Sequence, residues 1–229
     1  MTPIIKLMRR PAQPVWLDRS LWFPPPDQAD AEGLVAVGGD VAPERLLAAY
    51  RQGLFPWTVN PITWWSPDPR AVIELDQFHI PKSLAKYLRR QPFEITLDRA
   101  FPAVMQGCAA PGSGRKTTWI SPEFIAAYTR LHQLGHAHSV ECWRGGELAG
   151  GIYGLALGGF FAGESMFHRA DHASKAALCH LVAHLRARRF TLYHIQMTTP
   201  ITRAFGAREI PRREYLARLA LATAQPGTF

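Results

Sequence analysis

The chain has 229 residues, 47% of them hydrophobic, which is enough to bury a full core as one domain or as a large domain with a small companion. Lys and Arg outnumber Asp and Glu by 26 to 18, and this basic balance favours a polyanionic partner, nucleic acid before a membrane surface. The longest apolar run, residues 154–161, is too short to span a bilayer, and the N-terminus lacks the charged-then-apolar order of a signal peptide. Three widely spaced cysteines fit neither a disulfide framework nor a zinc knuckle. These features exclude a membrane span and predict a cytoplasmic protein with reduced cysteines.

Residues 1–70 are predicted to form a small N-terminal domain with few regular elements, because residues 14–70 are rich in Pro, Trp and Gly. Its one good helix is predicted over 43–52, with Pro43 in the first turn and Gly53 as the C-terminal stop. Large aromatic side chains crowd the same segment: Trp16, Trp22, Phe23, Phe55, Trp57, Trp64 and Trp65. Two interpretations are open: a loop-rich core packed by rings, or rings that face a cleft and stack on a ligand or a nucleobase.

Residues 71–229 are predicted to form a larger domain, because regular alternation of strands and helices begins at Ala71. The first predicted elements are a strand over 71–75, a helix over 81–90, a strand over 93–97, a helix that Asp98 caps and that runs to Cys108, and a helix that begins at Ser121 and closes at Gly135. Between the last two helices, residues 109–116 have the composition of a mobile basic loop that carries Arg115 and Lys116.

Two tight glycine turns predict two consecutive hairpins. The first joins strands over 138–143 and 147–157, and the second turns at Gly158-Gly159 within residues 151–168. The returning strand of the second hairpin is largely apolar and carries one carboxylate, Glu164, between Gly163 and Ser165. A buried carboxylate costs several kcal/mol unless something pairs with it, so we expect either a structural ion-pair partner or a cationic ligand beside Glu164.

A helix over 173–188, a strand over 190–196 and two final helices over 201–205 and 212–223 complete the prediction. The strand is apolar at its start and ends in His194-Ile195-Gln196. Open α/β sheets build their sites at the C-terminal edges of their strands, so these polar side chains are site candidates.

Several kinds of chemistry have no support in the sequence. A phosphate-binding loop, a dinucleotide fingerprint, a His-Glu-x-x-His zinc motif and a Gly-x-Ser-x-Gly nucleophile turn do not occur. The pairs His136/His138 and His180/His184 have metal-compatible spacing, but neither has an evident third ligand. We therefore predict no metal and no cofactor.

Nine sequence blocks, spread over about residues 20–216, together resemble the bacterial leucyl/phenylalanyl-tRNA–protein transferases. They are residues 23–25 (FPP), 33–40 (GLVAVGGD), 50–57 (YRQGLFPW), 64–70 (WWSPDPR), 118–120 (TWI), 136–141 (HAHSVE), 163–167 (GESMF), 173–175 (ASK) and 209–213 (EIPRR). The resemblance implies an α+β protein in which a small N-terminal domain precedes a larger domain with a GNAT-like (acyl-CoA N-acyltransferase) mixed sheet flanked by helices.

The same resemblance implies the activity. Members of this family move Leu or Phe, and less readily Met, from aminoacyl-tRNA to the α-amine of proteins or peptides that begin with Arg or Lys, which marks them for degradation in the N-end rule pathway. Aminolysis of an ester is energetically downhill, so it needs substrate placement, relief of a proton from the amine and donors for the oxyanion, without a cofactor. The basic composition suits tRNA, and the apolar strands suit a pocket for Leu and Phe.

Site residues follow from the resemblance position by position. The expected catalytic residues are Glu164, Gln196 and His194, and the expected substrate-cleft residues are Trp57 and Trp119. The expected lining of the aminoacyl pocket is Ile152, Phe161, Met166, Leu178, Leu181, Leu185 and Tyr193. The expected tRNA-binding residues, on one helix, are Lys82, Lys86, Arg89 and Arg90.

One expected position departs from the family pattern. His194 stands where the family has Asp, two residues before the glutamine, and this puts the acceptor preference or the proton pathway in question. Two other functions remain open at this point. A coenzyme-A acetyltransferase would need a pyrophosphate-binding Gly-rich turn, which does not occur, and a noncatalytic tRNA-binding protein would fit the altered site.

Overall fold

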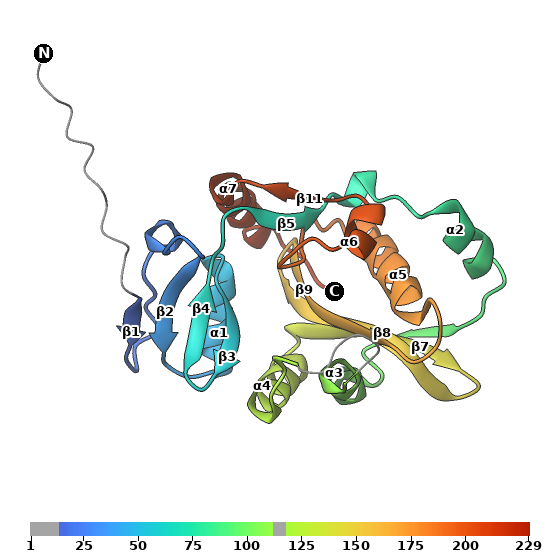
Figure 1. Cartoon of the computed structure of the whole chain (residues 1–229), viewed down its shortest axis with the longest axis horizontal. Helices are drawn as coiled ribbons and strands as arrows, with labels where there is room; N and C mark the ends of the chain where they lie inside the picture. Colours follow the sequence, from blue (N-terminus) through green and yellow to red (C-terminus); the bar gives the residue numbers. More distant parts are fainter. Residues whose placement is uncertain (1–13, 112–117) are drawn as a thin grey trace, which may run out of the picture.

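The computed structural model describes residues 14–111 and 118–229. The predicted basic loop falls largely between these ranges, so Arg115 and Lys116 lie outside the described residues. Two sheets, one of four strands and one of seven, organise the described chain. Figure 1 shows them side by side, with the small sheet at one end of the molecule.

The smaller sheet lies within the Pro- and Trp-rich segment. Its strands are β1 (Val15–Leu17), β2 (Leu34–Gly38), β3 (Phe55–Val59) and β4 (Ile62–Trp65), in the spatial order β1-β2-β4-β3, and a short 3₁₀ turn (Pro26–Gln28) precedes β2. Helix α1 (Pro43–Arg51) packs against it where the sequence predicts a helix. The strands were not predicted, because they are short and two of their pairings shift register, which erases a regular alternation.

The aromatic side chains of this segment do not all enter a core. Trp64 is fully buried and lies edge-on to Phe23 at 4.9 Å between ring centroids. By contrast, Trp16 and Trp22 are 72% and 59% exposed. The interpretation of a core packed by rings therefore holds for Trp64 and Phe23, and the stacking of exposed rings on a ligand stays a prediction.

The seven-stranded sheet carries the rest of the protein. Its strands are β5 (Arg70–Ile73), β6 (Glu94–Leu97), β7 (Ala137–Arg144), β8 (Glu147–Leu157), β9 (Phe160–His168), β10 (Leu192–His194) and β11 (Ala207–Ile210), in the spatial order β11-β5-β10-β9-β8-β7-β6. All neighbouring pairs are antiparallel except β9 and β10, which are parallel. The sheet is mixed, and the α+β fold class is confirmed.

Helices cover both faces of this sheet (Figure 1). Helices α3 (Phe101–Ala109) and α4 (Pro122–Gln133) pack on one face with Tyr153 and Leu155 of β8. Helix α5 (Ala173–Ala187) packs on the other face with Ile152 and Phe161. The remaining elements are a 3₁₀ turn (Leu75–Gln77), α2 (Lys82–Leu88), α6 (Pro200–Ala204) and α7 (Arg212–Thr223).

Most predicted elements occur close to their predicted bounds, and the two glycine hairpins occur as β7–β8 and β8–β9. Ser121 caps α4 by accepting a hydrogen bond from the Phe124 amide. The predicted cap at Asp98 is wrong: α3 begins three residues later, and Asp98 accepts hydrogen bonds from the Ser139 amide and from His138 Nδ1 instead. The predicted strand over 190–196 is only three residues long, and β11 was not predicted.

Within the described ranges, Cys108, Cys142 and Cys179 form no disulfide bond. In the described ranges, no helix combines the length and the apolar character needed to cross a membrane.

Candidate active site

A β-bulge places Glu164. Tyr153 of β8 pairs with Ser165 of β9, but the next residue, Gly154, pairs with Gly163, so Glu164 is the extra residue with no partner opposite it. A bulge reverses the alternation of side chains along a strand. Phe161 before the bulge and Met166 after it consequently both belong to the α5 face. Glu164 thus interrupts the regular alternation between the two faces of the sheet.

Glu164 is only 6% exposed, and in the described chain its carboxylate has one hydrogen-bond partner, the hydroxyl of Tyr50 in α1. Tyr50 donates a 2.7 Å hydrogen bond to Glu164 Oε1, and the Tyr50 hydroxyl is also hydrogen-bonded to the hydroxyl of Tyr128 in α4. Burial raises the pKa of Glu164 to about 8, while the Tyr50 hydrogen bond opposes part of that shift. Among the described residues, Glu164 Oε2 has no hydrogen-bond partner.

Sequence reasoning did not assign a role to Tyr50 or Tyr128. Two signals were available for Tyr50: it lies on the apolar face of the predicted helix, and it begins the family-like block over residues 50–57. Burial raises the pKa of both phenols well above their usual value, and the charge of Glu164 adds to this. Both hydroxyls therefore keep their protons and act as neutral hydrogen-bonding groups near the carboxylate.

Beside Glu164 lies a cavity of about 140 Å³ with a mainly apolar lining. The lining residues are Ile73, Ile152, Gly163, Glu164, Ser165, Met166, Leu178, Tyr193, Ile195, Gln196, Met197 and Thr202. Gly163 is needed at this wall, because a Cβ there would lie 2.9 Å from Cε2 of Tyr193. The ring of Tyr193 can therefore lie directly against β9.

Gln196 reaches the same cavity from the end of β10. Its backbone has a φ of +33°, which non-glycine residues rarely adopt, and Nε2 is buried without a hydrogen-bond partner in the described chain. Two such unpartnered polar atoms, Glu164 Oε2 and Gln196 Nε2, belong to residues of one cavity. Buried polar groups normally have partners, so this pair indicates a polar ligand.

The structure separates the seven residues expected to line the aminoacyl pocket into two groups. Ile152, Met166, Leu178 and Tyr193 line the cavity. The others, Phe161, Leu181 and Leu185, are buried in the core between β9 and α5 and are not among the lining residues.

His194 lies apart from the cavity lining. It is 1% exposed, and its Nε2 is 3.0 Å from Nη2 of Arg70, a buried cation that also donates to the Gly53 carbonyl and to Ser66 Oγ. Burial and then the charge of Arg70 hold the pKa of His194 well below its usual value. A neutral Nε2 that accepts from Arg70 is consistent with this environment, in which the guanidinium also lies over the Tyr215 ring at 4.0 Å. Because His194 is buried against Arg70 and lies outside the cavity lining, this geometry does not favour direct contact between His194 and an acceptor protein or peptide.

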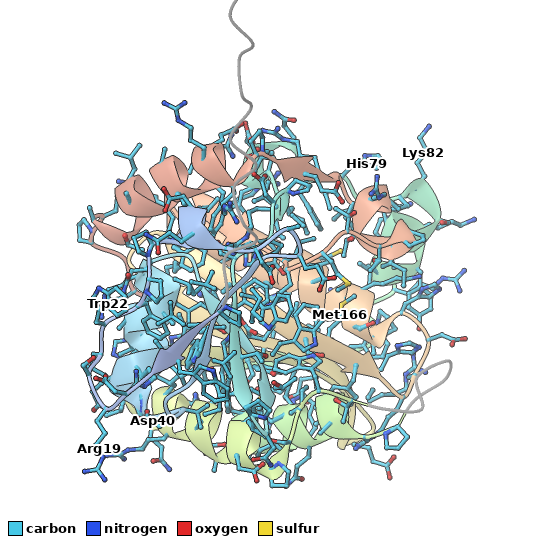
Figure 2. All side chains as sticks on the ribbon, turned by 60° about the vertical axis from the view of Figure 1, so that its left-hand side comes forward. Arg19, Trp22, Asp40, His79, Lys82 and Met166 are labelled. Carbon is cyan, nitrogen blue, oxygen red and sulfur yellow. The ribbon has the colours of Figure 1, made fainter. Side chains whose placement is uncertain are left out.

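The other expected residues lie farther out. Trp57 is half-buried against Phe55 and Trp65, and Trp119 is half-buried with its ring edge-on to Phe124. Neither lines the cavity. Lys82, Lys86, Arg89 and Arg90 are exposed on α2 and the turn after it. Figure 2 shows Lys82 extending outward from the edge of the molecule, whereas Met166 lies within its body.

The described residues contain no group of three or more His, Cys, Asp or Glu side chains that could hold a metal ion. His138 is paired with Asp98, at 2.7 Å from Nδ1 to Oδ2, and the Phe229 ring stacks on it at 4.2 Å.

A buried carboxylate with a raised pKa and an unpartnered side-chain amide in an apolar cavity are the elements of a site for acyl transfer. Comparison with known proteins places the chain among the acyl-transferring enzymes. Residues 72–220 match the family model described as leucyl/phenylalanyl-tRNA protein transferase, and residues 39–68 match the model of the N-terminal domain of the same family.

Curated relatives agree with the family models. The chain is 52% identical to the leucyl/phenylalanyl-tRNA–protein transferase of Nitratidesulfovibrio vulgaris (strain DP4), over 91% of each chain. It is 51% identical to that of Pseudomonas entomophila (strain L48), over 92% of this chain and 96% of the relative. The chain belongs to the leucyl/phenylalanyl-tRNA–protein transferase family and is an aminoacyltransferase.

Solved structures show more distant similarity. A GCN5-related N-acetyltransferase from Kribbella flavida matches with a TM-score of 0.39 and 11% identity, over 72% of this chain and 59% of that chain. The structure of L-PGS from Bacillus licheniformis matches with a TM-score of 0.42 and 11% identity, over 82% of this chain and 62% of that one. Family membership rests on the family models and the sequence relatives.

Proposed function

We propose that this protein transfers Leu or Phe, and less readily Met, from aminoacyl-tRNA to the α-amine of proteins that begin with Arg or Lys. In the cytoplasm this would create a degradation signal of the N-end rule type. The observation that carries the proposal is the apolar cavity whose residues include Glu164 and Gln196, each with a buried, unpartnered polar atom.

The cavity lining suits the donor side chain. Ile152, Met166 and Leu178 supply apolar surface, and the Tyr193 ring closes one wall. Burial of an apolar side chain contributes about 1.5–3 kcal/mol, which favours Leu, Phe and Met over polar aminoacyl groups. Among these three donors, selectivity depends on how well each side chain fits the shape of the cavity. One methylene group changes binding by about 1–3 kcal/mol.

Glu164 suits the acceptor. In the reaction, the acceptor ammonium first loses one proton, and the neutral amine nitrogen then forms a bond to the acyl carbon. The ester bond to the tRNA ribose breaks, and the second proton lost by the nitrogen ends on the ribose oxygen, which leaves as a hydroxyl group. The pKa of Glu164, about 8, lies close to neutral pH. A group whose pKa is close to the ambient pH both accepts and releases protons readily. An approaching cation would favour its ionised form, so Glu164 would both attract the acceptor and accept its proton. Gln196 Nε2 supplies a neutral donor for acceptor or oxyanion.

Four exposed cations on α2 and in the turn after it, the α2 cations, suit tRNA. Lys82, Lys86, Arg89 and Arg90 form no ion pair within the described part of the chain, so they are available to phosphates. His194 acts at a distance in this scheme: by accepting from Arg70, it ties the end of β10, and so Gln196, to the segment around Gly53.

Incubation with labelled Leu-tRNA and a peptide that begins with Arg tests the proposal, with Glu164→Gln as the key variant. We expect the variant to fold and bind tRNA while transfer drops about 100-fold or more, the scale for a positioned polar group. An unfolded variant would mean that Glu164 is structural. tRNA binding by the wild type without transfer would identify the protein as a noncatalytic tRNA-binding member of the family.

A further inference from the structure

A second cavity, of about 460 Å³, adjoins the candidate active site. Met166 lines both cavities, and the second one lies at the N-terminus of α5. Its lining residues are Met166, His168, Asp171, His172, Ser174, Lys175 and Ile201. The function derived above does not use it.

The first turn of α5 supplies hydrogen-bond donors to this cavity. The Ala173 amide donates to the Ala170 carbonyl and the Ala176 amide to the His172 carbonyl, whereas no acceptor within the described chain takes the amides of Ser174 and Lys175. Free amides at the start of a helix, together with the helix dipole, favour an anion. A helix of 15 residues has a full dipole.

A second observation, independent of the helix end, comes from the side chains. Ser174 is 6% exposed, and its hydroxyl, which belongs to the cavity lining, has no hydrogen-bond partner among the described residues. In the same wall, His172 Nδ1 is buried and likewise unpartnered in the described chain. A buried ring nitrogen without a partner, next to a largely buried serine whose hydroxyl forms no side-chain hydrogen bond in the described chain, indicates that a polar ligand completes the site.

The charges of the lining fit an anion. Lys175 adds a cation that forms no ion pair in the described ranges, and Asp171 is the only carboxylate in the lining. Asp171 is exposed, so solvent screens its charge more than it screens the donors around Ser174. The set of two amides, a hydroxyl and an ammonium matches the oxygens of a phosphate group.

The position of the cavity indicates which phosphate. On one side, the His172 ring contacts the ring of Tyr87 at 4.8 Å between centroids, and Tyr87 belongs to α2, which carries the exposed cations. On the other side, Met166 also lines the first cavity, whose lining includes Glu164 and Gln196. A ligand that runs from α2 to the active site would pass the N-terminus of α5.

We propose that this second cavity binds the phosphate next to the terminal adenosine of the aminoacyl-tRNA, one nucleoside away from the acyl group. The amides of Ser174 and Lys175, the Ser174 hydroxyl and the Lys175 ammonium hold its oxygens. The inference rests on the proposed function, because it takes the first cavity as the site of the aminoacyl side chain. By holding this phosphate, the site would position the aminoacyl ester of the tRNA. Helix α2 would then need to hold only the part of the tRNA farther from the ester.

Two unreactive donor analogues test this inference by calorimetry, without relying on activity. Both carry phenylalanine in amide linkage at the 3′ position of adenosine, and one also carries a 5′-phosphate. We expect the phosphate to tighten binding to the wild-type protein about tenfold, the effect of one charge-assisted hydrogen bond or slightly more. Ser174→Ala and Lys175→Gln should each lose most of this ratio and still bind the phosphate-free analogue normally.

Arg188→Gln is the matched control, because Arg188 is exposed at the opposite end of the same helix, and it should keep the full ratio. A ratio near one in the wild type, or an unchanged ratio in both variants, overturns the phosphate site and leaves the proposed function intact. Failure of the wild type to bind either analogue would instead count against the first cavity as donor site, and so against the proposed function. Tight binding of inorganic phosphate alone, without any preference between the analogues, would assign a free-anion site and also overturn the inference.

Discussion

The hydroxyl of Tyr50 donates a 2.7 Å hydrogen bond to Oε1 of Glu164, across 114 residues of the chain. Tyr50 belongs to α1, beside the small sheet, and Glu164 belongs to the bulge in the large one. This bond couples the two sheets at the candidate active site. It also stabilises the ionised form of a carboxylate that burial would otherwise keep protonated.

Tyr50→Phe should therefore raise the pKa of Glu164 further. The acid limb of the transfer rate should move to higher pH, and the rate at pH 7 should fall by about tenfold, the scale of one hydrogen bond to a charged group. A pH–rate profile checks this. Tyr128→Phe is the matched control, because Tyr128 contacts the Tyr50 hydroxyl but has no bond to Glu164 among the described contacts, and its effect should be smaller. Equal effects of the two variants would contradict the scheme.

Glu164 should also make stability depend on pH. Its pKa is raised from 4.5 to about 8 on folding, so the folded state binds more protons between these values, and stability should fall as pH rises from about 4.5 to 8. Glu164→Gln removes this dependence and should raise stability at pH 8, on the order of a few kcal/mol, while transfer drops about 100-fold or more. Urea unfolding of both proteins at pH 5 and pH 8 measures the difference. A variant less stable than the wild type at pH 8 would show that the carboxylate is structural.

His194 should have the opposite pH dependence. Its folded pKa lies well below the ordinary value of 6.5, so the unfolded state binds the extra proton, and the contribution of His194 is complete above pH 6.5 and is lost as pH falls below it. The limit is about 1.4 kcal/mol per pH unit. His194→Gln lacks this titration, so the stability difference between the variant and the wild type should change between pH 7 and pH 5. A constant difference would mean that His194 is charged or exposed in solution.

Leu178 and Leu181 offer a matched pair on α5. Both are buried, but only Leu178 lines the cavity. Truncation to Ala should destabilise the protein by about 2–5 kcal/mol at either position, because each leaves a space in the core. Only Leu178→Ala should change the relative kcat/KM for Leu, Phe and Met donors. A selectivity change in Leu181→Ala would return Leu181 to the pocket, as the sequence resemblance implies.

The α2 cations should determine the salt dependence of tRNA binding. Replacement of Lys82, Lys86, Arg89 or Arg90 by Ala should each lower the slope of log K against log salt by about one unit or less. Arg188→Ala, at the far end of α5, serves as the control and should leave the slope unchanged. Filter binding of charged tRNA at several salt concentrations measures the slopes. If all five variants behave alike, α2 is not the docking surface.

Local sequence determined much of this protein. Glycine pairs at 145–146 and 158–159 specify the two hairpins of the large sheet, because tight turns need backbone conformations that glycine adopts freely. The apolar strand around Glu164 marked that residue as one in need of a partner. Family resemblance added the reaction class, which the comparisons confirm.

Contacts between distant segments decided the rest. The bulge at Glu164, its bond to Tyr50 and the bond from Arg70 to His194 all join residues that no local pattern connects. Leu178, which lines the cavity, and Leu181, which lies in the core, are three residues apart on one helix face, so helical periodicity alone cannot tell them apart. Only the packing of α5 on the sheet separates them, because both are apolar positions on the same helix.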